Sequence, residues 1–314
     1  MSSTSSHSAT TDVASSVRFP RPSLVTLDVT GTLFTPRIPV GESYLLALRE
    51  HLPEGSGWER HLEELDADAL TTAFMKAYKA KSAEHPAFGA ATNLSSVEWW
   101  RDVVRHTYIH GGVDPALLQH EDGGSSGYFD RVFADLYYDV FVGERGWALL
   151  PNTHEVLQAL SSWRGSLGAD ERPVMGVISN FDERATEALA RFGLLQYFDF
   201  VLLSREQGVE KPHPQIFQSA VEEARRVRQQ WTKEGEPASP SSSSCVGVDR
   251  TTHVHIGDSF ERDIVGATQA GWSGVLVNNK GRQPKSDTNS AVNNFVSVNS
   301  LEDIPALFGL PTPV

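Results

Sequence analysis

The chain has 314 residues, 39% hydrophobic and 21% charged, a composition typical of a globular protein with two domains or one large one. Its 27 basic and 40 acidic residues give a net charge of −13, which argues against sequence-independent binding of nucleic acid but permits an anionic substrate at a local positive site. The single Cys245 excludes an internal disulfide and a cysteine-ligated metal cluster, and no apolar run approaches the ~20 residues of a membrane span.

Residues 1–22 are rich in serine and threonine and contain no apolar stretch like that of a secretory signal. We expect a disordered tail here. A mitochondrial transit peptide is the alternative, because the segment has few acidic residues and carries Arg18 and Arg21. Together with the lone cysteine, this favours an intracellular location: cytoplasmic, nuclear or, on the alternative interpretation, mitochondrial.

A predicted strand at residues 23–27 is followed by a long helical block. Residues 41–52, 66–82 and 95–108 carry apolar side chains at helical spacing, and residues 121–141 continue the pattern after a Gly/Ser break. In the second of these stretches, Leu70, Phe74, Ala77 and Tyr78 share one face. We therefore predict that residues 37–145 form an inserted helical domain.

Strands and helices alternate after Trp147. Strands are predicted at 172–180, 198–204, 252–258 and 273–279, with helices at 149–163, 182–194, 214–231 and 261–271. This order is typical of a Rossmann-like, doubly wound parallel sheet of the α/β class, whose domain comprises residues 23–36 and 146–314. The polar, low-complexity residues 232–250 are predicted to form a disordered loop within it.

Polar side chains follow the predicted strands at the edge where an open parallel sheet binds its ligands. In chain order they are Asp28, Ser179, Asn180, Lys211, Asp258 and Asp263. Singly, each has an ordinary explanation, a turn or helix cap for most of them and a solvated loop for the lysine. Their occurrence at four successive strand ends favours a site.

These residue types suit phosphoryl transfer. Neighbouring carboxylates repel one another unless a cation lies among them, and oxygen-only ligands favour Mg²⁺. A lysine and a hydroxyl can hold phosphate oxygens, while a carboxylate can attack phosphorus and form an aspartyl-phosphate. The sequence thus predicts a magnesium site that binds a small phosphorylated substrate.

Two aromatic and two histidine residues are further candidates for a site. The helical spacing of Trp99 and Trp100 favours packing inside the helical domain over contact with substrate. His253 and His255 share one strand face without a carboxylate at metal-ligand spacing, so a zinc site is not expected.

Four stretches, in order, resemble the motifs of the haloacid dehalogenase (HAD) superfamily: "LDVTGTLF", "VISN", "EKPHPQIF" and "HIGDSFERDI". The resemblance covers about residues 23–309 apart from the serine-rich loop. "FMKAYKAKSAEHPAFG" and "SSVEWWRDVV" further resemble the HAD-like hydrolase-domain-containing protein 3 group. The resemblance to the HAD superfamily implies that the helical insertion is a C1-type cap, which closes over the sheet edge and sets substrate specificity.

The resemblance also implies roles for individual residues. Asp28 matches the nucleophile and a Mg²⁺ ligand, and Lys211 matches the lysine that steadies nucleophile and phosphate. Asp258 and Asp263 match the two acids of the metal site. The phosphate-binding positions are matched by Thr32, Ser179 and the adjacent Asn180.

Thr30 departs from the family pattern. HAD phosphatases carry an acid at this position, which protonates the leaving group and then activates water. Threonine cannot do so near pH 7, and loss of a general acid or base costs about 10²–10⁴-fold in rate. Its backbone carbonyl can still serve as a metal ligand, as the family uses it.

Three hypotheses follow. The first is a Mg²⁺-dependent phosphatase acting on a small phosphate ester, with turnover handicapped by Thr30. The second is a catalytically weak or silent HAD-fold protein that binds a phosphorylated ligand or a protein partner. The third, a metal-free dehalogenase-like hydrolase, is disfavoured by retention of Asp258 and Asp263. No nucleic-acid or membrane partner is expected, and the oligomeric state is left open.

Overall fold

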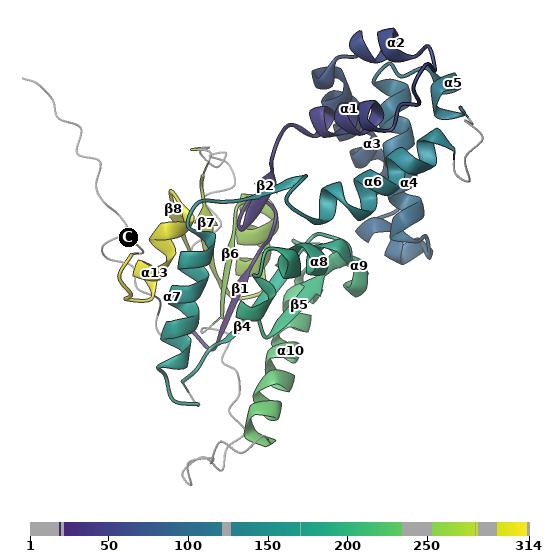
Figure 1. Cartoon of the computed structure of the whole chain (residues 1–314). Helices are drawn as coiled ribbons and strands as arrows, with labels where there is room; N and C mark the ends of the chain where they lie inside the picture. Colours follow the sequence, from purple (N-terminus) through teal and green to yellow (C-terminus); the bar gives the residue numbers. More distant parts are fainter. Residues whose placement is uncertain are drawn as a thin grey trace, which may run out of the picture.

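The computed structural model describes residue 19 and residues 22–120, 127–169, 171–233, 253–279, 281 and 294–312. A six-stranded sheet with every neighbouring pair parallel forms the centre of one part of the molecule, and the helices of residues 40–142 form the other part (Figure 1). In sheet order its strands are β5 (Phe200–Leu203), β4 (Val174–Ser179), β1 (Leu24–Leu27), β6 (His253–Gly257), β7 (Ser273–Val277) and β8 (Phe295–Val298). The predicted α/β fold is confirmed.

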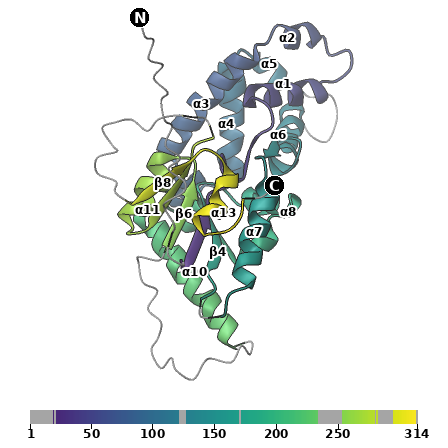
Figure 2. The same cartoon turned by 90° about the vertical axis from the view of Figure 1, so that its left-hand side faces the viewer.

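Helices cover both faces of this sheet, which explains the nearly continuous apolar strands. They are α7 (Thr153–Gly165), α8 (Arg184–Arg191), η4 (Leu195–Tyr197), α9 (Ser204–Gln207), α10 (Pro214–Lys233), η6 (Phe260–Val265), α11 (Gly266–Gln269), η7 (Leu301–Asp303) and α13 (Ile304–Leu307). On one face, Val25 and Leu27 of β1 pack in a cluster with α7, α8 and α13. On the other, Leu24 packs in a cluster with α10 and α11, and Figure 2 shows α7 and α10 on opposite sides.

The segment between β1 and α7 is a separately packed helical unit, residues 40–142. Its elements are α1 (Val40–Glu50), α2 (Glu59–Glu63), α3 (Ala67–Glu84), η2 (Ala87–Thr92), α4 (Ser96–His110), α5 (Pro115–Leu118), α6 (Tyr128–Tyr138) and η3 (Val140–Val142). Apolar side chains of these helices form two clusters of their own. A capping box of Ser95 and Glu98 starts α4.

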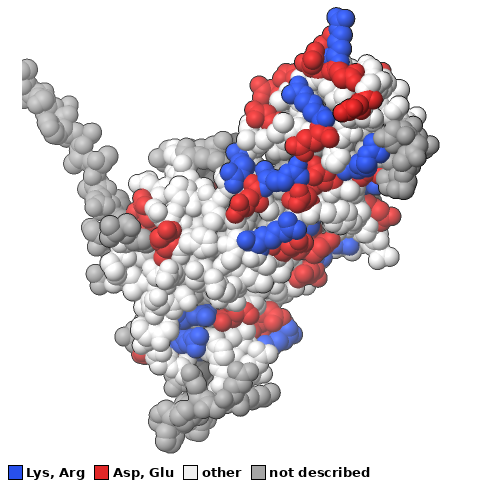
Figure 3. All heavy atoms as spheres, in the orientation of Figure 1, with Lys and Arg blue, Asp and Glu red and all other residues white. Residues whose placement is uncertain are grey.

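A short antiparallel ribbon joins the helical unit to the sheet. It pairs β2 (Phe34–Pro36) with β3 (Trp147–Leu149). Beside it, Arg145 binds Glu50 of α1, Asp135 of α6 and Asp139, each at 2.5 Å, so the chain that leaves the unit is tied to its first and last α-helices. On the face seen in Figure 3, such basic and acidic side chains are interspersed over the unit.

Several details differ from the sequence-based expectation. The ribbon and β8 were not predicted; the two ribbon strands have only three residues each, which leaves little periodicity to detect. A π-helical turn, η6, opens the helix predicted at 261–271, and α10 extends through Lys233 into the predicted loop 232–250. The rest of that loop lies outside the described residues.

The predicted N-terminal tail lies outside the described residues except for Phe19 and Pro22. Phe19 donates its backbone N–H to Leu307 at 3.1 Å, and its ring lies 6.2 Å from that of Phe308. Among the described helices, none has both the length and the apolar character needed to cross a membrane.

Candidate active site at the carboxyl edge of the sheet

Asp28 directly follows β1, one of the two central strands of the sheet. Leu27 pairs with Val177 of β4 and Ile256 of β6, and the N–H of Asp28 continues the ladder to the Ile256 carbonyl at 2.8 Å. The residue is only 7% exposed. Its carboxylate therefore emerges at the centre of the carboxyl edge with its backbone fixed by the sheet.

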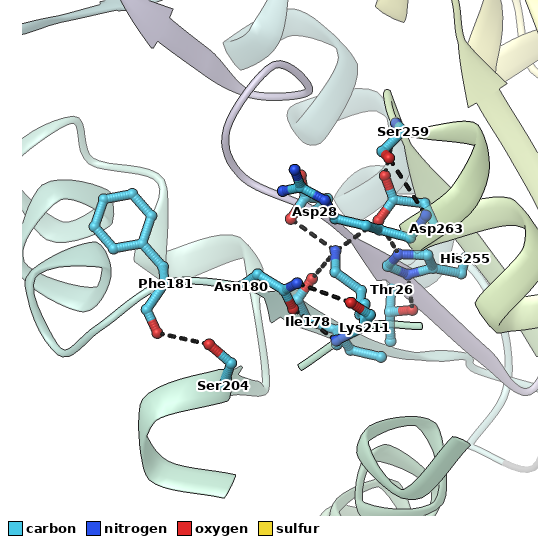
Figure 4. A network of polar contacts seen from close by, with 11 residues as sticks. Thr26, Asp28, Ile178, Asn180, Phe181, Ser204, Lys211, His255, Ser259 and Asp263 are labelled. Carbon is cyan, nitrogen blue, oxygen red and sulfur yellow. Dashed lines mark hydrogen bonds and ion pairs between the residues drawn. The ribbon is translucent and has the colours of Figure 1, made fainter. Parts of the chain in front are cut away.

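Lys211 reaches Asp28 from the loop after α9. Its Nζ donates to Asp28 Oδ1 at 2.8 Å, to Asp263 Oδ1 at 2.6 Å and to the Ile178 carbonyl at 2.7 Å (Figure 4). An ammonium group has three hydrogens, and all three are used. Burial alone would lower the pKa of Lys211, but the carboxylates of Asp263 and Asp28 raise it above its ordinary value.

The side chain of Asn180 holds the Lys211 backbone in place. Its Nδ2 donates to the Lys211 carbonyl at 2.9 Å, and its Oδ1 accepts from the Lys211 N–H at 2.7 Å. Asn180, predicted to bind substrate, thus has both polar ends of its amide engaged by the chain itself. Ser179, the last residue of β4, is buried at the same edge.

Three carboxylates gather at this point. One oxygen each of Asp28, Asp258 and Asp263 lies within 4.8 Å of the others. Gly31, with φ +87°, leaves room for Asp258, since a β-carbon there would overlap its carboxylate. Such an all-oxygen set fits a divalent cation, because carboxylates this close repel one another and the single charge of Lys211, which contacts Asp28 and Asp263, offsets only one of the three.

Asp263 is held by three hydrogen-bond donors. Its Oδ2 accepts the Ser259 N–H at 2.8 Å, and its Oδ1 lies 3.1 Å from Nε2 of His255 in addition to the bond with Lys211. Burial would raise the pKa of the Asp263 carboxyl, but Lys211 and the His255 hydrogen bond hold it well below its usual range. Burial, followed by the nearby Lys211 charge, lowers the pKa of His255.

The two threonines of the first motif lie in different surroundings. Thr30 is partly exposed and forms an isolated bridge with Phe34. Thr32 is fully buried, and its hydroxyl has no hydrogen-bond partner among the described residues. The turn containing both closes through the Leu33 N–H, which donates to the Val29 carbonyl at 2.8 Å.

The helical unit contacts the chain just beyond Ser179 and Asn180. Nε1 of Trp100 donates to Asp182 Oδ2 at 2.5 Å, and Arg184 forms two 2.8 Å bonds with the same carboxylate. The Arg184 guanidinium lies over the rings of Trp100 and Tyr137 at 4.7 and 4.2 Å from their centroids. Trp99 is fully buried within the unit, as predicted.

A second contact brings η2 beside α9 and the loop that follows it, residues 208–213, which carries Lys211 and is called the lysine loop. Arg205 donates to the Phe88 carbonyl at 3.0 Å, and the Glu210 carboxylate accepts the Ala87 N–H. Burial raises the pKa of Glu210, which directly precedes Lys211. The helical unit therefore contacts two of the segments that supply the site.

Sequence reasoning missed two kinds of residue. His255 was considered only as a zinc ligand, yet η6 returns Asp263 to within 3.1 Å of its Nε2. The Asp182–Arg184 pair was interpreted only as a helix start. The acid–arginine spacing in "SNFDER" offered a local signal, but nothing in it pointed to Trp100.

Comparison with known proteins agrees with this architecture. A family model described as haloacid dehalogenase-like hydrolase matches residues 22–271. The chain therefore belongs to the family of haloacid dehalogenase-like hydrolases, as the four motifs indicated.

Its relatives include haloacid dehalogenase-like hydrolase domain-containing protein 3 from several vertebrates. The Bos taurus protein is 33% identical over 255 residues, which cover 81% of each chain. The Danio rerio protein is 31% identical over 280 residues, which cover 89% of this chain and 93% of the relative. The predicted resemblance to this group is confirmed.

Solved structures share the fold. A dehalogenase with an intermediate complex aligns with a TM-score of 0.58 at 16% identity, covering 93% of this chain and 99% of that one. The 2-haloacid dehalogenase from Pseudomonas syringae pv. Tomato DC3000 aligns with a TM-score of 0.52 at 23% identity, covering 92% and 98%. At these identities the likeness establishes the architecture alone.

Proposed function

We propose that this hydrolase is a Mg²⁺-dependent phosphatase that acts on a small phosphate ester, with Asp28 as its nucleophile. One observation carries the proposal: the Lys211 ammonium bridges Asp28 and Asp263 beside a group of three carboxylates at the sheet edge. A nucleophile, a fixed cation and a set of oxygen ligands are the parts that phosphoryl transfer needs.

In this mechanism Lys211 fixes the Asp28 carboxylate by holding Oδ1, and Oδ2 attacks phosphorus. The new bond joins Asp28 to phosphorus as the ester P–O bond breaks, and water then hydrolyses the aspartyl-phosphate to regenerate the carboxylate. The Ser179 hydroxyl binds a phosphate oxygen, and the positive charge of Lys211 offsets the negative charge of the phosphate. Asn180 keeps the Lys211 backbone in register with the site.

Asp28, Asp258, Asp263 and the Thr30 carbonyl would hold Mg²⁺. The bound ion would supply positive charge to the phosphate and relieve the repulsion among the carboxylates. The all-oxygen donor set and the room that Gly31 leaves for Asp258 support this assignment.

We assign residues 37–145 as a cap domain over a core of residues 23–36 and 146–314. The hydrogen bond from Trp100 to Asp182 and the contact between η2 and the lysine loop support this role, because both link the unit to segments that supply the site. A cap in this position would shield the aspartyl-phosphate from bulk water and select the substrate.

Thr30 limits the proposed cycle. The leaving alkoxide needs a proton and the hydrolytic water needs a base, and a threonine hydroxyl supplies neither near pH 7. Esters with acidic leaving groups should therefore react fastest. The same feature supports a second candidate function, a catalytically silent protein that binds a phosphorylated ligand.

The test is hydrolysis of an aryl phosphate with and without Mg²⁺, comparing wild type with Asp28→Asn. Aryl leaving groups need little acid assistance, so turnover that requires both Mg²⁺ and Asp28 is expected. Binding of inorganic phosphate with Mg²⁺ but no turnover would support the silent protein instead. Metal-independent release of halide from a 2-halo acid would replace both with a dehalogenase.

A further inference from the structure

We propose that His255 is a positioning residue of this site: through Nε2 it sets the orientation of Asp263 and so keeps Lys211 aligned with Asp28. This inference rests on the proposed phosphatase function for its kinetic consequence. The contact itself is independent of turnover and can be tested without it.

The direction of the hydrogen bond follows from its partner. Asp263 Oδ1 accepts a bond from the Lys211 ammonium at 2.6 Å, and its Oδ2 accepts the Ser259 N–H. A carboxylate engaged in this way can only accept, so Nε2 of His255, 3.1 Å from Oδ1, carries a hydrogen and donates it.

The imidazole ring is itself fixed on its other side. Thr26 of β1 is the direct sheet neighbour of His255 in β6, and its Oγ1 lies 2.8 Å from Nδ1. The ring of Phe217 from α10 meets the imidazole edge-on, with centroids 5.4 Å apart and planes at 86°. His255 is fully buried, so no rotation of the ring is free of a packing clash.

Three donors from three separate segments thus define the plane of the Asp263 carboxylate. Lys211 comes from the loop after α9, His255 from β6 and the Ser259 N–H from the start of η6 (Figure 4). Without the histidine donor, the carboxylate could turn about its Cβ–Cγ bond. Lys211 donates to the same oxygen, Oδ1 of Asp263, as His255 does. A turn of this carboxylate would therefore shift the Lys211 ammonium away from its position beside Asp28.

His253 provides a matched control. It lies two residues earlier on the same strand and face, is equally buried, and packs its ring against Trp272 at 4.9 Å. The described contacts give it no bond to Asp263. Substitution at His253 tests the cost of altering a buried histidine in β6 without the proposed positioning role.

The experiment compares His255→Gln with His255→Asn, two variants with the same amide group but different reach. A glutamine amide extends to the position of Nε2, whereas an asparagine amide reaches only that of Nδ1. We expect His255→Asn to lower kcat for aryl phosphate by about 10–100-fold, the usual effect of losing a partner behind a ligand, with little change in KM. His255→Gln should recover most of the loss, and His253→Asn should keep kcat near wild type.

Two outcomes would overturn the proposal. One is equal kcat values for the glutamine and asparagine variants at a temperature where both are folded. The other is a kcat of His255→Asn no lower than that of His253→Asn. Either would show that a buried polar side chain suffices at position 255.

A spectroscopic measurement keeps the test valid if the wild type hydrolyses nothing. In the wild type, NMR should detect a slowly exchanging imidazole N–H proton that is lost in His255→Gln and retained in His253→Asn. An exposed, rapidly exchanging proton on His255 would refute the contact. Absence of turnover with this signal present would refute only the proposed function.

Discussion

Removing the buried ammonium of Lys211 tests the electrostatic arrangement of the site most directly. In Lys211→Met the side-chain volume is largely kept, but Asp28 and Asp263 lose the cation between them. The side chains of Lys211 and Asp263 are each 1% exposed and that of Asp28 is 10% exposed, so water cannot replace the lost partner. Each lost charge-assisted bond is worth about 1.5–3 kcal/mol, and removing one partner of a buried pair costs about 3–5 kcal/mol. We expect the free energy of unfolding to fall by about 3–5 kcal/mol at pH 7.

The pH dependence of this loss has a definite sign. In the wild type the pKa of Asp263 is lowered from 3.8, so its stabilising contribution is present above the unfolded pKa and lost as the pH falls through the folded one. In Lys211→Met, burial and the nearby Asp28 charge raise the folded pKa of Asp263 instead. The stabilising contribution of its protonated form is then lost as the pH rises through this raised value. The variant should therefore become less stable between about pH 5 and 7, where the wild type changes little.

Chemical denaturation across this pH range, followed by tryptophan fluorescence, measures both effects. Lys79→Met, an exposed lysine on α3, is the control and should change stability by less than about 0.5 kcal/mol. Added Mg²⁺ should restore part of the stability of Lys211→Met, because a cation again lies among the carboxylates. A loss below about 1 kcal/mol, or a pH dependence identical to that of the wild type, would refute the reasoning.

Three further predictions concern the turn, the missing acid and the cap contact. Thr30→Asp should raise kcat for an alkyl phosphate by about 10²-fold or more and for an aryl phosphate by less, as measured by phosphate release. Gly31→Ala should remove the Mg²⁺ dependence of the melting temperature, because its β-carbon overlaps Asp258 and alanine disfavours φ +87°; calorimetry with and without Mg²⁺ measures this. Trp100→Phe should lower the free energy of unfolding by about 1–3 kcal/mol in denaturation experiments, because the buried Asp182 carboxylate loses one donor while an aromatic ring is kept.

Each of these predictions has a clear contrary result. No gain from Thr30→Asp on either ester would favour the silent binding protein. A melting temperature of Gly31→Ala that rises with Mg²⁺ as in the wild type would place the cation away from Asp258. An unfolding free energy of Trp100→Phe equal to the wild type would show that Arg184 alone satisfies Asp182.

The sequence by itself determined the α/β class and the positions where the site residues emerge. Apolar runs marked β1, β4, β5, β6 and β7, and parallel strands must bring their carboxyl ends to one edge. Asp28, Lys211 and Asp258 could therefore be grouped although they are far apart in the chain. A threonine at position 30 likewise predicted a weakened proton transfer, because that prediction depends only on the type of residue.

Only the tertiary structure decided how these residues are paired. Three contacts depend on how loops and helices pack onto the sheet. Lys211 bridges Asp28 and Asp263, Asn180 binds the Lys211 backbone, and His255 donates to Asp263. The contact from the helical unit joins Trp100 to a carboxylate 82 residues away. Periodicity and motif spacing indicate local geometry. Such contacts depend instead on side-chain packing between segments that are distant in sequence, which local patterns do not predict.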